Sequence, residues 1–127
     1  MTRILILLLL FSPFAVAQQS QTAVTPPIHE KIFVHFDKPY YETGEMIWFK
    51  AYLYSNGIPS TRSNNFYVQL TNATGQVMGT LHYPISNATV AGSFQLPDSL
   101  PDGYSEFRAT TALITGTDPA FMYQTRI

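Results

Sequence analysis

Apolar and polar residues alternate along several short stretches of this chain, and the alternation has the two-residue period of a β-strand. It is clearest in residues 47–53, 66–70 and 90–96, where every second side chain would face the same side of an extended strand. Outside residues 1–17, no window shows apolar residues at the three- and four-residue spacing of a helix. The predicted inward-facing residues are Ile47, Phe49, Ala51, Leu53, Phe66, Val68, Leu70, Val90, Phe94, Leu96, Phe107 and Ala109.

Seven strand-like runs follow one another in the remainder of the chain, separated by turn-forming residues. Hairpin-type breaks occur at 55–57 and 72–75, and proline and glycine frame a longer connection at 97–103. Short strands at regular spacing are typical of a two-layer β-sandwich, so we expect an all-β fold. The predicted strands are 31–36, 46–54, 65–71, 76–83, 90–96, 104–112 and 120–127.

A structural turn is predicted between the first two strands. Asp37 can accept hydrogen bonds from backbone N–H groups two residues on, and Pro39 restricts its own φ. Gly44 supplies a positive φ where the second half of the turn needs one. Because a slip of one residue would exchange the core and solvent faces of the next strand, we expect this turn to set its register.

Composition indicates one globular domain without nucleic-acid partners. Hydrophobic residues make up 46% of the 127 residues and charged residues 12%, which favours a packed core over disorder. The formal net charge is −1, and no basic cluster of the kind that binds nucleic acid is present. The chain contains no cysteine, which excludes disulfides, thiol nucleophiles and zinc–thiolate sites.

The N-terminal residues have the pattern of a secretory signal peptide, predicted over residues 1–17. Arg3 supplies the positive charge, residues 4–11 are an unbroken apolar run, and residues 15–17 form a small-residue cleavage site. The alternative is a retained membrane anchor, although the apolar run is short for a span of about 20 residues. We therefore expect an exported protein, in the periplasm, on the outer-membrane surface or secreted, with a linker at 18–29 and a domain at 30–127.

The residues around the predicted turn also carry a family resemblance. The pattern Asp-Lys-Pro-x-Tyr-x-x-Gly-Glu-x-x-x-Phe, from Asp37 to Phe49, resembles the signature of a macroglobulin domain, the repeat of α2-macroglobulins and complement-type proteins. Residues 66–70 and 96–103 fall where that family has strands and turns. The version most similar to this one is found in large exported surface proteins of Bacteroidetes. The resemblance covers roughly residues 30–127 and implies a seven-stranded sandwich of the immunoglobulin or fibronectin III type.

The resemblance implies a non-catalytic binding or scaffold module of the bacterial cell envelope. The family is associated with endopeptidase inhibition by entrapment, which needs a bait segment, further domains and usually an internal thioester; a thioester requires a cysteine. This chain departs from the family where Ser105 stands in place of a usual tyrosine. It also stops at Ile127, so the alternatives are a one-domain protein or the N-terminal fragment of a longer multidomain protein.

Candidate catalytic and metal-binding residues are few. His29, His35 and His82 could in principle bind zinc, but none has another histidine at ligand spacing. Carboxylates at positions 37, 42 and 45 form an acidic corner that could serve acid–base catalysis or calcium, and a small enzyme combining a histidine with this corner is one hypothesis. Turn capping and solvated loop charges explain the same residues, so we predict no catalytic residues, no metal and no cofactor.

An aromatic face is the predicted interaction site. Trp48, Tyr52 and Tyr54 alternate with the inward-facing residues of the second strand, and Tyr67 would point the same way if the third strand shares its sheet. Aromatic side chains on a solvent-side face mark contact surfaces because they combine large area with a polar group. Ordinary cross-strand packing is the alternative reading. The expected partners are neighbouring domains or envelope proteins, and peptidases are also considered.

The sequence offers one candidate surface for binding glycans and one candidate residue for carrying a glycan. Exposed aromatic rings on this face could stack on sugar rings, so the alternative function is a carbohydrate-binding module accompanying an outer-membrane receptor system. In addition, the tripeptide at 98–100 resembles the short O-glycosylation site of Bacteroidetes exported proteins, which makes Ser99 a candidate modification site. An unmodified loop is the alternative for Ser99.

Overall fold

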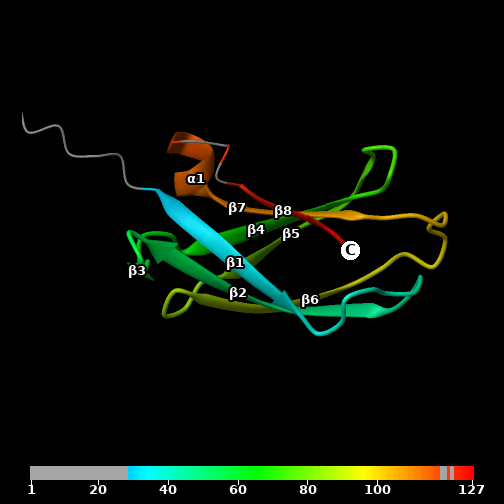
Figure 1. Cartoon of the computed structure of the whole chain (residues 1–127), viewed down its shortest axis with the longest axis horizontal. Helices are drawn as coiled ribbons and strands as arrows, with labels where there is room; N and C mark the ends of the chain where they lie inside the picture. Colours follow the sequence, from blue (N-terminus) through cyan, green and yellow to red (C-terminus); the bar gives the residue numbers. More distant parts are fainter. Residues whose placement is uncertain (1–28, 118–119, 121) are drawn as a thin grey trace, which may run out of the picture.

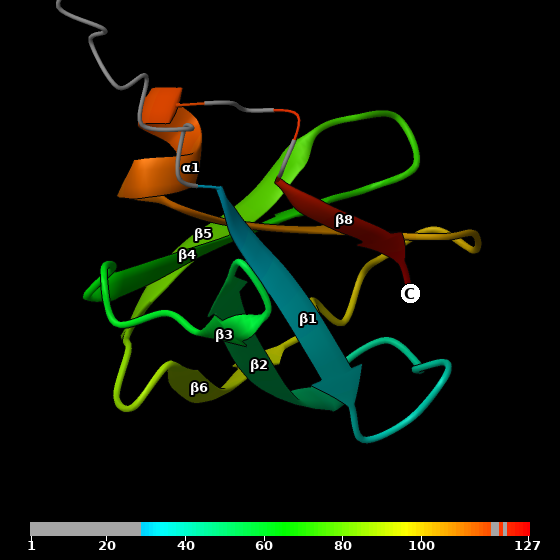
Figure 2. The ribbon, with the colours of Figure 1, turned by 60° about the vertical axis from the view of Figure 1, so that its left-hand side comes forward.

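The computed structural model describes residues 29–117, 120 and 122–127, and these form two antiparallel β-sheets packed face to face (Figures 1 and 2). The predicted signal peptide, and the predicted linker except for its last residue, lie outside the described residues. The helix in the described part of the chain lacks the length and apolar composition needed to cross a bilayer. The strands are β1 (Glu30–Phe36), β2 (Met46–Ser55), β3 (Ile58–Pro59), β4 (Asn65–Thr71), β5 (Val77–Pro84), β6 (Thr89–Gln95), β7 (Glu106–Thr111) and β8 (Tyr123–Arg126).

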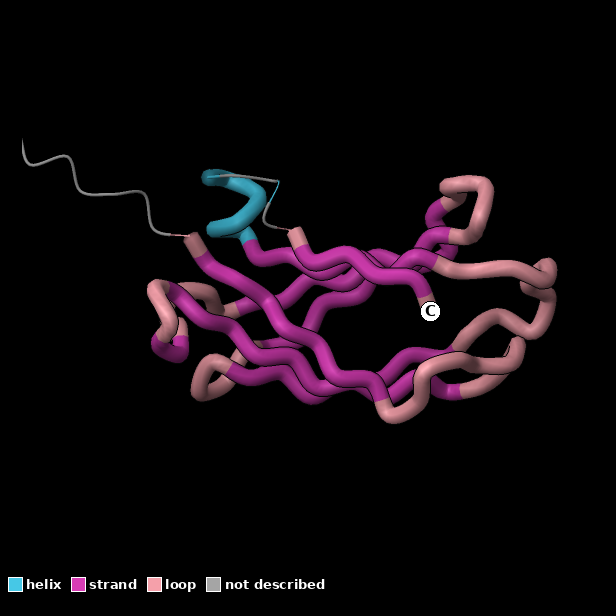
Figure 3. Tube along the Cα trace, in the orientation of Figure 1, coloured by secondary structure: helices cyan, strands magenta, loops and turns pink. Residues whose placement is uncertain are grey.

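Each sheet has four strands, and β2 and β4 are the inner strands about which they are built. β2 pairs with β1 on one side and with β3 and β6 on the other, whereas the second sheet has the order β5-β4-β7-β8. Figure 3 shows the strands as two layers joined by loops at both ends of the molecule. The predicted all-β sandwich is therefore confirmed.

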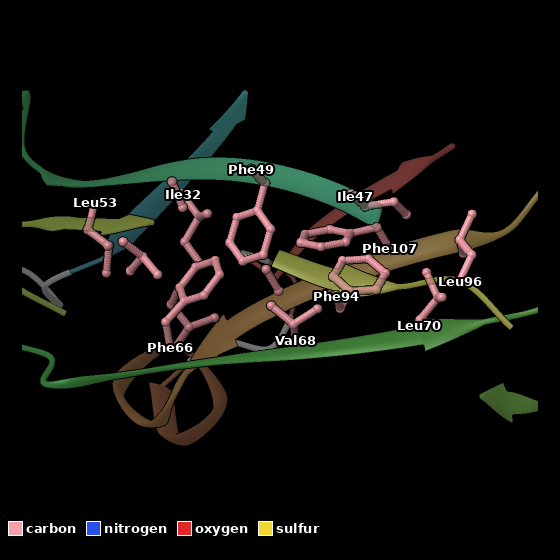
Figure 4. Close-up of a cluster of buried hydrophobic side chains, with 14 residues drawn as sticks. Ile32, Ile47, Phe49, Leu53, Phe66, Val68, Leu70, Phe94, Leu96 and Phe107 are labelled. Atoms are coloured by element: carbon pink, nitrogen blue, oxygen red, sulfur yellow. The ribbon is translucent and has the colours of Figure 1, made fainter. Parts of the chain in front are cut away.

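The core lies between the two layers and consists of the residues that the alternation predicted. Every second side chain of β2 is buried, and the inward side chains of β4, β6 and β7 meet them from the other strands. Figure 4 shows Phe49 of β2 pointing toward Phe66 and Val68 of β4. All twelve residues predicted to face inward are buried, namely Ile47, Phe49, Ala51, Leu53, Phe66, Val68, Leu70, Val90, Phe94, Leu96, Phe107 and Ala109.

Phe49 is the aromatic centre of this core. Its ring lies 6.1 Å from that of Phe66 and 5.5 Å from that of Phe107, both in the opposite sheet. Gly92 stands directly beside Phe49 in the β2–β6 pairing, and a Cβ at that position would lie 2.5 Å from Cζ of the ring. The missing side chain of Gly92 thus makes the space that the Phe49 ring occupies.

Three parts of the secondary structure differ from the sequence-based expectation. A two-residue strand, β3, joins the edge of β2. The predicted strands 104–112 and 120–127 correspond to β7 and β8, which are shorter than predicted because they begin at Glu106 and Tyr123. A short helix, α1 (Ala112–Thr117), follows β7 where no helix was expected. Its start is capped by Thr111, whose Oγ1 accepts a hydrogen bond from the Ile114 N–H at 3.2 Å. A helix of this length is too short to show apolar periodicity, so the prediction of no helix was wrong there.

Candidate interaction site

The turn between β1 and β2 is held by Asp37, although not by the bonds predicted from sequence. Oδ1 of Asp37 accepts hydrogen bonds from the Tyr41 hydroxyl at 2.5 Å and from the Trp48 N–H at 3.2 Å. The Asp37 N–H also donates to the Trp48 carbonyl at 3.1 Å. The expected bond from the N–H group two residues on was wrong, because that residue is Pro39, which has no N–H; the carboxylate instead reaches across to the start of the next strand. The hydrogen bond from Tyr41 lowers the pKa of Asp37.

Gly44 has the positive φ that the second half of the turn was expected to need, at 77°. Its N–H donates to the Pro97 carbonyl at 3.3 Å, so the turn also joins the loop that follows β6. Lys38 Nζ lies 2.6 Å from Glu45 Oε1, and this hydrogen bond lowers the pKa of Glu45. Pro39 lies exposed within the turn. In the acidic corner, the carboxylates of Asp37 and Glu45 therefore accept hydrogen bonds that hold the turn.

The predicted aromatic face divides between the two sheets. Trp48 is 57% exposed on the outer side of β2, and Tyr52 and Tyr54 lie half-buried on the same side. Tyr67 lies on β4, which belongs to the second sheet, so its side chain faces solvent on the opposite side of the sandwich. The placement of Tyr67 on the Trp48 face was therefore wrong, because β2 and β4 do not share a sheet.

Side chains of β1 complete the outer face in place of Tyr67. Phe33 lies directly opposite Tyr52 in the β1–β2 pairing, and it is 54% exposed. Its ring meets that of Tyr54 edge-on at 5.7 Å, and the His35 ring meets that of Tyr52 at 5.5 Å. Sequence reasoning missed Phe33 because both faces of β1 carry apolar residues. The cue available was that Phe33 is adjacent to Ile32, a residue that the structure buries, because adjacent residues of a strand face opposite sides.

These side chains border a groove of about 830 Å³ on the outer surface of the first sheet, which we call the β1–β2 groove. Apolar and aromatic groups form most of its surface, and Lys31 and His35 supply ammonium and imidazole groups along the β1 side. A concave, mainly apolar surface with a few polar groups is the usual form of a binding site. The groove is lined by His29, Lys31, Phe33, His35, Tyr52, Tyr54, Asn56 and Gly57.

Two lysine side chains lie on this face. Lys31 lines the groove, and Lys50 lies beside it with Nζ 5.5 Å from the centre of the Tyr52 ring. Among the described residues that line the groove there is no carboxylate. Asp37, at the end of β1, already accepts two hydrogen bonds at the turn. The outer face of β1 and β2 thus combines aromatic rings with two lysine side chains that form no ion pair with any described carboxylate.

The three histidines do not assemble into a metal site. His29 and His35 line the groove, whereas His82 is on β5 in the other sheet, with its ring 6.5 Å from that of Tyr67. Within residues 29–117, 120 and 122–127, no three histidine or acidic side chains lie close enough together to hold a metal ion. Catalysis that combines His82 with the Asp37 turn would need residues from separate sheets, and the structure does not bring them together.

A buried polar cluster around Glu30 was not foreseen from the sequence. Glu30 is 1% exposed, and its carboxylate accepts hydrogen bonds from the hydroxyls of Ser60 at 2.6 Å, Ser63 at 2.5 Å and Thr111 at 2.8 Å. These donors come from the segment between β3 and β4 and from the end of β7. The Glu30 cluster satisfies a buried acid and joins the two sheets, so we assign it a structural role.

Ser99 lies exposed in the turn that follows β6, next to Asp98. In the same loop, the Pro97 carbonyl accepts the hydrogen bond from the Gly44 N–H. Exposure in a turn is compatible with a glycan, and O-glycosylation of Ser99 stays a prediction.

Comparison with solved structures relates this fold to bacterial α2-macroglobulins. Two structures of Salmonella α2-macroglobulin, one of a point mutant and one of the protein reacted with methylamine, each give a TM-score of 0.64 and 18% identity over 80% of this chain. Trypsin-activated α2-macroglobulin from Escherichia coli gives a TM-score of 0.62 and 15% identity over 77% of this chain. No protein-family profile and no curated protein matches the sequence.

This likeness shows the fold: the chain has the architecture of a domain found in bacterial α2-macroglobulins. The chain spans about 6% of the length of the proteins to which it is compared.

Proposed function

We propose that this chain is an exported, non-catalytic, macroglobulin-like module of the bacterial cell envelope. Its role is to bind another polypeptide, either a neighbouring domain or an envelope protein, through the outer face of β1 and β2. The shared architecture with a domain of bacterial α2-macroglobulins supports a modular role. The signal-like sequence of residues 1–17 supports export.

The observation that carries the proposal is the exposure of large apolar rings on one face. Phe33 and Trp48 are each more than half exposed, at 54% and 57%, and they lie on the same outer face as the half-buried Tyr52 and Tyr54. Contiguous exposed apolar surface is uncommon unless it contacts a partner, and aromatic residues are enriched at the centres of protein interfaces. The face therefore has the composition of an interface whose partner is another protein.

The hydrogen bonds of the Asp37 turn support a non-catalytic role. Asp37 and Glu45 accept hydrogen bonds from Tyr41 and Lys38, and each of these bonds lowers the pKa of its carboxyl group. A general base poised near neutral pH needs a raised carboxyl pKa. The shifts at this turn have the opposite direction, so these carboxylates are suited to holding the turn.

Site-specific photo-crosslinking in cells tests the proposal. A photoreactive amino acid at position 48 should give crosslinks to another polypeptide. The same amino acid at position 67, another exposed aromatic position, on the outer side of the second sheet, is the matched control. Equal crosslinking at the two positions, or none at position 48, would argue against a dedicated interaction face on β1 and β2.

The family association with endopeptidase inhibition leads to a separate expectation. Entrapment involves many domains, whereas this chain corresponds to about 6% of the length of the Salmonella protein. We therefore expect no stoichiometric inhibition when the purified chain is titrated into several peptidases acting on a protein substrate. Inhibition of several unrelated peptidases at equal molar ratios would replace the binding-module proposal with an inhibitor function.

A carbohydrate-binding module is the second candidate, and the observation in its favour is the exposed indole of Trp48. Indole rings stack on ligand faces at little entropic cost, and sugars offer such faces. Binding to a panel of oligosaccharides that is lost in Trp48→Ala would favour this candidate. Binding that survives the substitution would count against it.

A further inference from the structure

The β1–β2 groove allows the chemistry of the partner to be stated more closely, and this step rests on the proposed function. We infer that the groove receives an extended acidic polypeptide segment in which carboxylate and large apolar side chains alternate along one face, at every second residue.

The rings in the groove form a corrugated surface. The planes of Phe33 and Tyr54 are inclined at 81°, and those of His35 and Tyr52 at 67°. In each pair one ring stands steeply inclined to the other, so the pair presents an uneven surface in place of a single flat ring face. A sugar ring stacks best on a flat, exposed ring face, and neither pair provides a shared flat surface. The geometry in the groove therefore favours apolar side chains of a polypeptide over a glycan.

The charges near the rings select the sign of the partner. Lys31 and Lys50 lie on opposite sides of the Phe33–Tyr52 pair, on neighbouring strands. The facing residues of β6, Ala91 and Ser93, are uncharged. Complementary charges increase the association rate and disfavour partners of the wrong sign. A segment with carboxylates on both sides of an apolar side chain would pair with both lysines.

The periodicity of the groove matches an extended segment. Lys31, Phe33 and His35 follow one another at every second position of β1, so cationic and aromatic groups repeat along the strand direction. A partner chain in extended conformation presents its own side chains with the same period. A segment with glutamate or aspartate two residues before and two residues after a leucine or phenylalanine carries all three side chains on one face, so it would place its apolar side chain near Phe33 and its carboxylates near the lysines.

The experiment titrates the isotope-labelled chain with capped synthetic peptides and follows the backbone amide signals. The probe is a peptide in which glutamate and leucine alternate at every second residue, with serine between them, so that both types lie on one face of the extended chain. The comparison peptides replace glutamate by lysine, or leucine by serine, and an anionic uronic-acid oligosaccharide is the glycan probe. We expect the glutamate–leucine peptide to shift the signals of β1 and β2 and to bind most tightly, with an affinity that falls as salt is added.

Variants locate the binding. Reversal of both charges, Lys31→Glu with Lys50→Glu, should weaken binding about tenfold, since each exposed ion pair contributes a fraction of a kcal/mol and reversal adds repulsion. Arg126→Glu is the matched control, because Arg126 is an exposed cation on β8 in the second sheet. Thermal unfolding of each variant confirms that the fold is retained.

Each result decides the inference. Equal binding of the glutamate and lysine peptides, no binding of any peptide, or preferential binding of the oligosaccharide would each overturn it. A tenfold loss in Arg126→Glu equal to that in the lysine double variant would overturn it as well. Crosslinking of position 48 to a polypeptide, combined with failure of the acidic peptide, would leave the proposed function standing and reject only the acidic partner.

Discussion

At Gly44 a single residue determines whether the β1–β2 turn can close. Its φ of 77° lies in the region that residues with a Cβ rarely adopt, and a Cβ built there would overlap Oδ1 of Asp98. The conformation lets the Gly44 N–H bond to Pro97 while the Glu45 carbonyl accepts from the Leu96 N–H at 2.9 Å. The turn and the loop that follows β6 are therefore joined at Gly44 and Glu45.

Gly44→Val should lower the unfolding free energy by about 2 kcal/mol or more, because a β-branched residue combines backbone strain with the overlap at Asp98. Gly116→Val is the control, since Gly116 has no positive φ and a Cβ there meets nothing within 4 Å. Denaturant unfolding monitored by circular dichroism measures both. Equal stability of the two variants would show that the conformation at Gly44 does not contribute to the stability of the fold.

Tyr41 makes the stability of the same turn dependent on alkaline pH. Burial and the hydrogen bond to Asp37 raise the pKa of Tyr41 to about 12, from an ordinary value of 10.0. A group whose pKa is raised by folding contributes its full stabilisation at pH values below its pKa in the unfolded chain. That stabilisation is lost as the pH rises through the folded value, here between pH 10.0 and about 12.

In Tyr41→Phe, this alkaline loss should be smaller than in the parent when the unfolding free energy is measured across that range. Tyr83 and Tyr123 also have a raised pKa because of burial, so the difference between parent and variant isolates Tyr41. Tyr40→Phe, at the exposed neighbouring residue, is the control. Identical pH profiles for the two variants would contradict the assignment to Tyr41.

At the scale of elements, the Glu30 cluster connects parts of the chain that do not pair as strands. The carboxylate lies at the start of β1, and its donors come from the loop before β4 and from Thr111 at the end of β7. Thr111 also caps α1, so the position of that helix depends on the same cluster. A helix this short is stabilised by tertiary contacts, here the Thr111 cap and the burial of Ile114 in the core.

Glu30→Gln should destabilise the chain by about 1–3 kcal/mol, because an amide N–H₂ would replace one acceptor that the buried hydroxyls need. Urea unfolding gives the change in free energy. Glu42→Gln, at an exposed position of the turn, makes the same chemical change and should leave stability near that of the parent. A neutral outcome for Glu30→Gln would mean that the hydroxyls find other acceptors.

At the scale of the whole molecule, two layers are joined by one aromatic core. The core has no cysteine to reinforce it, so its cohesion comes from packing and from the Glu30 cluster. Phe49 contributes most visibly, because its ring meets rings from both sheets (Figure 4). The opposite side of β2 carries the aromatic residues proposed to bind a partner. One strand therefore supports both the core and the candidate site.

Phe49→Ala should cost about 3–5 kcal/mol, the usual range for removing a buried phenylalanine. Phe33→Ala removes the same ring from the outer face, where it is 54% exposed, and should cost far less. Thermal and denaturant unfolding compare the two directly. A larger loss of unfolding free energy in Phe33→Ala than in Phe49→Ala would show that the core and solvent faces of the first sheet have been assigned the wrong way round.

Sequence alone predicted the strands and their inward faces because that information is local. Alternation with period two within β2, β4 and β6 needs only the order of neighbouring residues, and the burial of Phe49 and Phe66 followed from it. The positive φ at Gly44 was likewise anticipated, since glycine adopts that conformation at little cost.

Only the tertiary structure decided which faces lie together. Whether Tyr67 or Phe33 shares the surface of Trp48 depends on strand pairings between distant segments, and no local pattern records sheet membership. The burial of Glu30 likewise depends on hydroxyls 30, 33 and 81 residues further along the chain. The candidate site emerged at this level because hydrogen-bonded pairing of β1 with β2 brings Lys31 and Phe33 beside Tyr52.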